Sequence, residues 1–207
     1  MELIIASRNV HKIRELRSIL KKLTAFDLLS LIDFPHYHPP EETGSTFEEN
    51  ANLKAAHAAK QLGRWVLADD SGLVVPALGG APGIFSHRYA GEHATDKENR
   101  QKLLNALIGI DESQRQGYFE CWIALASPEG LKKSVRGITE GMITEHERGG
   151  LGFGYDPIFV KYEYSKTFAE LEEETKNRIS HRRKAIDKLL PFLESIQHVE
   201  SDAPLTP

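Results

Sequence analysis

This chain has very little cysteine and no excess of basic over acidic residues, and both facts exclude several classes of protein. Cys121 is the only cysteine among 207 residues, which excludes an internal disulfide and a multi-thiolate zinc site. Acidic residues number 30 against 26 lysines and arginines, so the chain does not have the basic character usual in nucleic-acid-binding proteins. We therefore expect a protein of a reducing compartment that forms no stable complex with nucleic acid.

Long apolar runs are also lacking. No run approaches the roughly 18 apolar residues that a membrane span requires. The start, Met1 to Ala6, has neither the basic segment nor the long apolar stretch of a signal peptide. The sequence therefore predicts a cytoplasmic protein with no membrane partner, and its 40% hydrophobic and 27% charged residues are ordinary for a globular domain.

Apolar periodicity predicts alternating strands and helices. Strands are expected at 3–6, 26–31, 65–68, 73–75, 118–126 and 158–160, with one or two more in 135–143. Helices are expected at 10–23, from 45 or 46 to 62, at 95–107 and from about Ser180 onward, where Pro191 should kink or shorten the last helix. This pattern implies an α/β protein with a mixed sheet. Residues 1–197 should form one domain, followed by a flexible tail at 198–207.

Two expected helix starts carry positive charge where the helix dipole favours negative charge. They are Ser7 to Lys12, in which Asn9 suits the N-cap, and Ser180 to Lys184. A bound phosphate would resolve the conflict, because helix N-termini present free N–H groups. A solvated basic turn explains the first site equally well, and no P-loop pattern occurs in the chain.

Two acidic pairs supply the oxygen ligands that Mg²⁺ prefers. Asp69-Asp70 follow a strand directly and precede Gly72, which would let a ligand approach the backbone. Glu41-Glu42 precede the next helix. The structural alternatives are a hydrogen-bonded turn for the first pair and an exposed loop for the second. Taken together with the basic helix starts, the pairs indicate a metal–phosphate site.

Three further residues have both a functional and a structural explanation. Lys54 lies on the apolar stripe of its helix. Its ammonium either pairs with a partner at the edge of a cleft or reaches the solvent along the surface, and for Lys54 alone the second explanation is the better one. Phe153, flanked by glycines, either fills the core or stacks on a flat base. Cys121 is expected to be a small apolar residue of its strand rather than a nucleophile.

Six ordered motifs resemble those of the inosine triphosphate pyrophosphatase family, the Ham1-like enzymes. They cover nearly the whole chain and are Ser7-x-Asn9-x-x-Lys12-x-x-Glu15, Glu42-Thr43-Gly44 with Thr46-Phe47 and Asn50, Ala68 to Leu73, Gly79 to Gly83, Gly152 to Pro157, and Ser180-His181-Arg182. The resemblance implies a long curved mixed sheet with a helical lobe on each side, a central nucleotide cleft and a homodimer. It also implies Mg²⁺-dependent hydrolysis of ITP, dITP and XTP to the monophosphate and pyrophosphate, which keeps these nucleotides out of DNA and RNA.

The resemblance also implies roles for individual residues. Asp70 becomes the catalytic residue and a metal ligand, and Glu41 is chosen over the adjacent Glu42 as the second metal ligand. Arg8 departs from many family members, which have glycine there, and its side chain would narrow the phosphate-binding turn. The substrate contacts implied are Ser7, Arg8, Asn9, Val10, His11, Lys12, Lys54, Ser71, Phe153, Gly154, Tyr155, Asp156, Lys176, His181 and Arg182.

The resulting hypothesis is that Asp70, with Mg²⁺, positions or deprotonates a water that attacks in line and breaks the α–β linkage of the triphosphate. Lys12 and Lys54 would stabilise the charge that develops on pyrophosphate. Lys176, with His181 or Arg182, would donate to the 6-keto oxygen and so reject ATP, which carries an amino group there. The alternatives are a pyrophosphatase for modified pyrimidine nucleotides and a sensor that binds an inosine nucleotide without hydrolysing it.

Overall fold

A computed structural model describes residues 1–21, 23–24 and 26–201 of the chain. Its strands are β1 (Glu2–Ile5), β2 (Asp27–Ser30), β3 (Trp65–Val74), β4 (Gln116–Ser127), β5 (Gly130–Ile143) and β6 (Phe159–Lys161). Its α-helices are α1 (Val10–Leu20), α2 (Phe47–Leu62), α3 (Asp96–Ala106), α4 (Glu173–Ile179) and α5 (His181–Ser201). None of the helices in this described part is long and apolar enough to cross a membrane.

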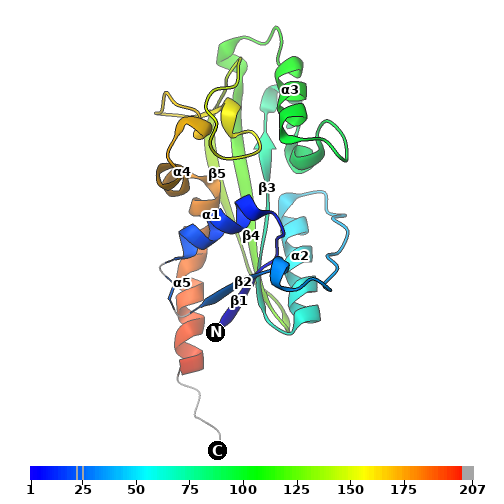
Figure 1. Cartoon of the computed structure of the whole chain (residues 1–207), viewed down its shortest axis with the longest axis vertical. Helices are drawn as coiled ribbons and strands as arrows, with labels where there is room; N and C mark the ends of the chain where they lie inside the picture. Colours follow the sequence, from blue (N-terminus) through cyan, green and yellow to red (C-terminus); the bar gives the residue numbers. More distant parts are fainter. Residues whose placement is uncertain (22, 25, 202–207) are drawn as a thin grey trace, which may run out of the picture.

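The strands form one mixed sheet in the order β2-β1-β3-β4-β5-β6. Strand β1 pairs in parallel with β2 and β3, whereas β3 to β6 pair antiparallel. Figure 1 shows β3, β4 and β5 along the long axis of the molecule, with α2 and α3 on one side and α1, α4 and α5 on the other. The predicted α/β class with a mixed, curved sheet and helices on both sides is confirmed.

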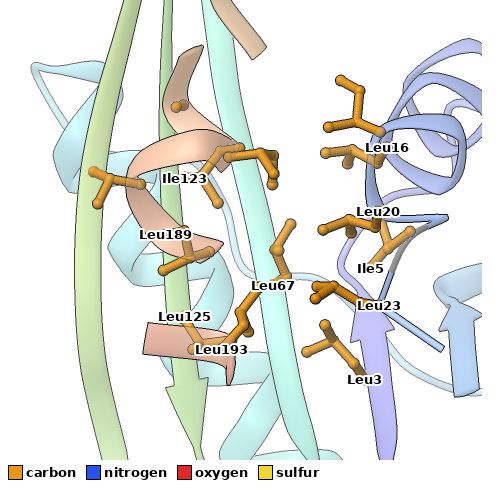
Figure 2. Close-up of a cluster of buried hydrophobic side chains, with 14 of the residues drawn as sticks. Leu3, Ile5, Leu16, Leu20, Leu23, Leu67, Ile123, Leu125, Leu189 and Leu193 are labelled. Carbon is orange, nitrogen blue, oxygen red and sulfur yellow. The ribbon is translucent and has the colours of Figure 1, made fainter. Parts of the chain in front are cut away.

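One face of the sheet, which we call the leucine face, packs against α1 and α5. Side chains from alternate positions of β1, β3 and β4 point toward these helices, as the period of two in a strand requires. Figure 2 shows the resulting cluster, which includes Leu3, Ile5, Leu67, Ile123 and Leu125 from the sheet and Leu16, Leu20, Leu189 and Leu193 from the helices. Each such buried side chain contributes roughly 1.5–3 kcal/mol, so this layer is a main source of stability.

The opposite face of the same strands, the alanine face, packs against α2. Its buried alanines are Ala6, Ala68, Ala124 and Ala126 from the sheet and Ala51, Ala55, Ala58 and Ala59 from the helix. Because alanine ends at Cβ, the helix can lie close to the strands. Helix α2 starts at the Thr46 N-cap, whose side chain accepts from Glu49 N–H at 3.1 Å, and it ends at Gly63 in a left-handed conformation.

A second core lies at the other end of the long strands. It joins β3, β4 and β5 to α3 and to the segment after β5, through Leu73, Leu103, Leu107, Phe119, Ile143, Tyr155, Ile158, Phe159 and Phe168. Two hydrophobic regions separated along β3 therefore hold the two ends of the molecule, and the middle of β3 lies between them.

Strand β3 is continuous, so the predicted separation of 65–68 from 73–75 is wrong. Asp69, Asp70, Ser71 and Gly72 lie inside the strand and pair with β4. The interruption was expected because four polar or small residues break the apolar pattern. A Cβ at Gly72 would lie 2.3 Å from Ser86 Oγ, so the absence of a side chain there lets the neighbouring 3₁₀ segment pack against β3. Gly72 also lines the cavity described below, and its predicted role in the approach of a ligand stays a prediction.

Several other elements differ in part from the sequence analysis. A single strand covers 135–143, which confirms one of the two predicted alternatives, but it begins earlier than expected, at Gly130. Pro191 lies inside α5 and does not shorten it, since the helix runs to Ser201, while the alternative of a kink stays a prediction. Helix α4 was not predicted. Of the tail predicted at 198–207, residues 198–201 belong to α5, and residues 202–207 lie outside the described residues.

Candidate active site

A cavity of about 580 Å³ lies beside the middle of β3 and gathers nearly all the predicted site residues. This volume is in the range of small-molecule sites. Val10 and His11 lie outside its lining, and Val10 is 61% exposed. The predicted residues that line it are Ser7, Arg8, Asn9, Lys12, Glu41, Lys54, Asp70, Ser71, Phe153, Gly154, Tyr155, Asp156, Lys176, His181 and Arg182.

The turn between β1 and α1 is built around Asn9. Its side-chain oxygen accepts hydrogen bonds from His11 N–H at 3.0 Å and Lys12 N–H at 3.2 Å, which confirms the predicted N-cap. No acidic residue lies in the first turn of α1, so its positive end remains uncompensated by a carboxylate of that turn. Arg8 donates to the Tyr37 carbonyl at 2.7 Å, and its side chain is thereby held by the loop after β2.

Asp69 points to the leucine face and is surrounded by donors. Lys12 Nζ lies 2.5 Å from Oδ1, and Arg182 Nε donates to Oδ2 at 3.1 Å. Burial alone would raise the pKa of Asp69, but the charges of Arg182 and Lys12 hold it well below its usual range. Cys121 Sγ also donates to Oδ2, at 2.9 Å, and burial raises the pKa of this thiol, so Cys121 is an inert donor rather than a plain apolar residue.

Arg182 begins a chain of buried charges that leads toward the glycine-rich loop. Its guanidinium is 1% exposed and also contacts Glu15 and, at 3.0 Å, Ser71 Oγ. Glu15 pairs in turn with Lys176 at 2.5 Å, and Lys176 pairs with Asp156 at 2.5 Å. Three cations, counting Lys12, thus face three carboxylates, counting Asp69. Because the charges balance, their mutual attraction offsets much of the desolvation cost of burying them, and the ion pairs fix the positions of the side chains.

An aromatic surface lies at the far end of this network. The Phe153 ring is 4.7 Å from Lys176 Nζ and stacks on His11 with centroids 5.3 Å apart. His181 stacks on Phe119 at 4.8 Å. Burial, with the positive charge of Arg182, holds the pKa of His181 well below its usual value, so this imidazole is neutral.

Asp70 points to the alanine face and has different surroundings. Lys54 Nζ contacts Asp70 Oδ1 at 2.7 Å and Glu42 Oε1 at 3.0 Å. Burial raises the pKa of Asp70 above its usual value, although Lys54 opposes this shift. Lys54 is therefore a cleft residue rather than a lysine extended along the surface. Glu41 and Glu42 both line the cavity, and Glu42 in addition shares Lys54 with Asp70.

The donor set suits a hard divalent cation together with an anionic ligand. No group of three or more His, Cys, Asp and Glu side chains in the described ranges is arranged to hold a metal ion by itself. Mg²⁺ is usually held by one or two carboxylates with phosphate oxygens completing its shell, and Asp70 and Glu42 are carboxylates of that kind. Lys12, Lys54 and the start of α1 supply positive charge around them.

Several residues important to this site were not chosen from the sequence. Asp69 and Glu15 hold the buried network, and Asp96 and Arg88 line the cavity. A signal for Asp69 existed: in a continuous strand, two adjacent carboxylates point to opposite faces and must differ in role. The sequence also contained a signal for Glu15, which lies one helical turn from Lys12 on α1 and belongs to the first motif.

The mixed sheet and its cleft define an α/β protein with a cavity in which carboxylates and basic groups lie together. The Ham1 family model matches residues 3–192, and the chain belongs to the Ham1 family.

Individual relatives agree with this assignment. The chain is 56% identical over 198 residues to the dITP/XTP pyrophosphatase of Protochlamydia amoebophila, which covers 95% of this chain and 100% of the relative. The dITP/XTP pyrophosphatase of Chlamydia abortus is 52% identical over 197 residues, or 95% and 96% of the two chains. The solved structure of a HAM1 protein from Coxiella burnetii has a TM-score of 0.85 at 45% identity and covers 94% of this chain and 99% of its own.

Proposed function

We propose that this protein hydrolyses ITP, dITP and XTP to the nucleoside monophosphate and pyrophosphate, and so removes non-standard purine nucleotides before they enter DNA and RNA. The names of the two relatives, both dITP/XTP pyrophosphatases, support this substrate class. The observation that carries the proposal is the pairing of Asp70 with Lys54 in the cavity, 2.7 Å apart. The start of α1 lies at the same cavity, and its first turn contains no acidic residue to offset the helix dipole. This arrangement joins a base, a cation and an anion site.

Mg²⁺ is the cofactor that we propose, with Asp70 as its first protein ligand. Asp70 meets Lys54 through Oδ1, and its second oxygen is the natural donor to the metal. The contact of Glu42 with Lys54 favours Glu42 over Glu41 as the second carboxylate. When bound, the metal would neutralise phosphate charge and polarise the scissile linkage.

The chain's own residues account for the hydrolytic step. Asp70 has a raised pKa, which suits it to orient a water molecule and accept its proton. The water oxygen attacks the α-phosphorus, the bond to the bridging oxygen breaks, and pyrophosphate leaves with the electron pair. Lys12 and Lys54 stabilise the charge on the leaving group.

Recognition of the base depends on the other end of the cavity. Phe153 offers an aromatic face, and Lys176 beside it is the donor we assign to the 6-keto oxygen. Lys176 donates to Glu15 and Asp156, which leaves one of its three N–H groups for the base, whereas each nitrogen of the Arg182 guanidinium already contacts Asp69, Glu15 or Ser71. Adenine would present an amino group to the Lys176 ammonium and leave both donors unpaired, which disfavours ATP.

The larger organisation is also part of the proposal. We place residues 1–197 in a single two-lobed unit that acts as a homodimer in the cytoplasm and does not bind nucleic acid stably. Light scattering coupled to gel filtration should then give twice the 23.2 kDa chain mass.

The direct test is pyrophosphate release from ITP, XTP, ATP, GTP and dUTP, each with and without Mg²⁺. We expect Mg²⁺-dependent release from ITP and XTP far above the other three. Preferred hydrolysis of dUTP would instead identify a pyrimidine nucleotide pyrophosphatase. Tight binding of ITP without pyrophosphate release would identify a sensor.

A further inference from the structure

Helix α3 holds both backbone polar groups of one residue in the glycine-rich loop. Asp96 Oδ2 accepts a hydrogen bond from Gly154 N–H at 2.7 Å, and Arg100 Nη1 donates to the Gly154 carbonyl at 2.8 Å. Asp96 and Arg100 are four residues apart and therefore share one face of the helix. More than fifty residues separate this helix from the loop in sequence, so the contact is a feature of the fold.

Two side chains of α3, Arg100 and Asn99, also form hydrogen bonds with other segments around the cavity. Arg100 is braced by Glu147, which accepts from Nη2 at 3.0 Å, and the side chain of Arg100 is only 12% exposed. Asn99, buried beside it, donates to the His87 carbonyl at 2.9 Å and accepts from Ala90 N–H at 2.7 Å. A helix with few apolar residues thus uses its polar face to fix two segments around the cavity.

The loop itself depends on such fixing. Gly152 and Gly154 have positive φ angles of 76° and 59°, a region that glycine enters readily, so the backbone on either side of Phe153 has little conformational preference of its own. Phe153 N–H is bound by Asp156 at 2.9 Å, and the Tyr155 hydroxyl donates to the Ser86 carbonyl at 2.8 Å. Hydrogen bonds within the loop and to other segments, together with the contacts of the ring with His11 and Lys176, therefore hold Phe153 in place.

We propose that Asp96 and Arg100 are positioning residues for base recognition: they clamp Gly154 so that the Phe153 ring stays beside Lys176, where a purine can stack. This inference rests on the proposed function, whose base pocket it extends. It also changes the role of Gly154, since its N–H is occupied by Asp96 and the base is recognised by neighbouring groups instead. Asp96 and Arg100 thus influence the affinity for the nucleotide through the position of Phe153.

The test compares Asp96→Ala and Arg100→Met with wild type, using XTP and ITP as substrates and inorganic tripolyphosphate as a competitive inhibitor. Each variant should raise the KM for XTP and ITP about tenfold, the loss of one charge-assisted hydrogen bond, with kcat nearly unchanged. The inhibition constant of tripolyphosphate, which has no base, should not change. Hydrogen exchange in the peptide spanning 150–157 should become faster.

Conservative and matched variants complete the design. Asp96→Asn and Arg100→Lys keep an acceptor and a donor, respectively, and should restore most of the affinity. Lys97→Met changes an exposed residue of the same helix and should behave as wild type. Thermal melting identifies any variant that fails to fold, and the conservative pair then carries the test.

The outcomes separate this inference from the proposed function. An unchanged KM in variants with wild-type turnover overturns the clamp and leaves the proposed function intact. An equal rise in KM and in the tripolyphosphate constant also overturns it, because the defect would then be general. If wild type releases no pyrophosphate from XTP or ITP, the proposed function fails, while hydrogen exchange in 150–157 still decides whether α3 fixes the loop.

Discussion

Asp69 and Asp70 are adjacent in β3 yet belong to two different regions of the molecule. Asp69 continues the leucine face and is surrounded by Lys12, Arg182 and Cys121. Asp70 continues the alanine face, where Lys54 is its ion-pair partner and is shared with Glu42. The pKa of the first is lowered and that of the second is raised. A fully satisfied carboxylate stabilises the fold, whereas a partly satisfied one retains the capacity to bind and to accept a proton.

Replacing Asp70 should have the largest effect on activity and the smallest on stability. We expect Asp70→Asn to lower kcat by about 10²–10⁴-fold, the usual contribution of a general base. The free energy of unfolding should change by less than about 1 kcal/mol, because Lys54 keeps Glu42 as its partner. Steady-state pyrophosphate release and urea denaturation measure the two quantities. Near-normal turnover would remove Asp70 from the mechanism.

Replacing Asp69 should show the reverse pattern. Asp69→Asn removes the carboxylate that pairs with Lys12 and one of the two that pair with Arg182, and it should cost about 3 kcal/mol in unfolding free energy. Since the folded pKa of Asp69 lies below its unfolded value of 3.8, its contribution is present above that value and is lost as pH falls through the folded pKa. Denaturation at pH 7 and pH 3 should therefore show a smaller difference from wild type in acid. Equal destabilisation by Asp69→Asn and Asp70→Asn would erase the contrast between the faces.

The pH dependence of activity should sharpen the comparison further. Burial raises the pKa of Asp70 above 3.8, so kcat/KM should rise with pH through a value higher than that of an ordinary aspartate. Lys54→Met removes a charge that opposes this shift and should move the acid limb to higher pH. Lys54→Arg keeps the charge and serves as the control. An acid limb that does not move would mean that another group titrates in that range.

The mildest prediction concerns Cys121 on the leucine face. Cys121→Ala removes the thiol donor to Asp69 and should cost about 1 kcal/mol in unfolding free energy, with activity retained. In the native protein this fully buried thiol should be unreactive toward a disulfide reagent and should become reactive in urea. Rapid labelling of the native protein would contradict its burial and its hydrogen bond.

Much of the fold could be predicted because most elements bury an apolar stripe. The strand expected at 118–126 lies within β4, and the helix expected at 95–107 is α3 with Thr95 as its N-cap. Helix α4 could not be predicted, because its buried residues are Lys176 and Asn177. Strand β3 was divided for the same reason, since ionic partners replace apolar neighbours at its centre.

The sequence predicted that certain residues share one site, and most of them line one cavity, but it did not predict the contacts between them. All the predicted site residues except Val10 and His11 line the cavity, but the motifs did not identify other lining residues such as Arg88 and Asp96. They could not show that Lys54 meets Asp70, because that contact depends on how closely α2 lies to β3. The contacts of α3 with Gly154 could not be predicted either. The residue spacing within α3 indicates which of its side chains share a face, but not which distant segment of the chain they contact.

The alanine face also limits how this protein can vary. Ala51, Ala55 and Ala58 hold α2 against the sheet, and Lys54 lies between them on the same helix. A larger side chain at Ala55 would move the helix outward and would carry the lysine away from Asp70 in the same motion. The distance between α2 and the sheet therefore sets both the packing of the alanine face and the contact of Lys54 with Asp70. Substitutions at these alanines of α2 should impair activity even though the alanines do not belong to the cavity lining.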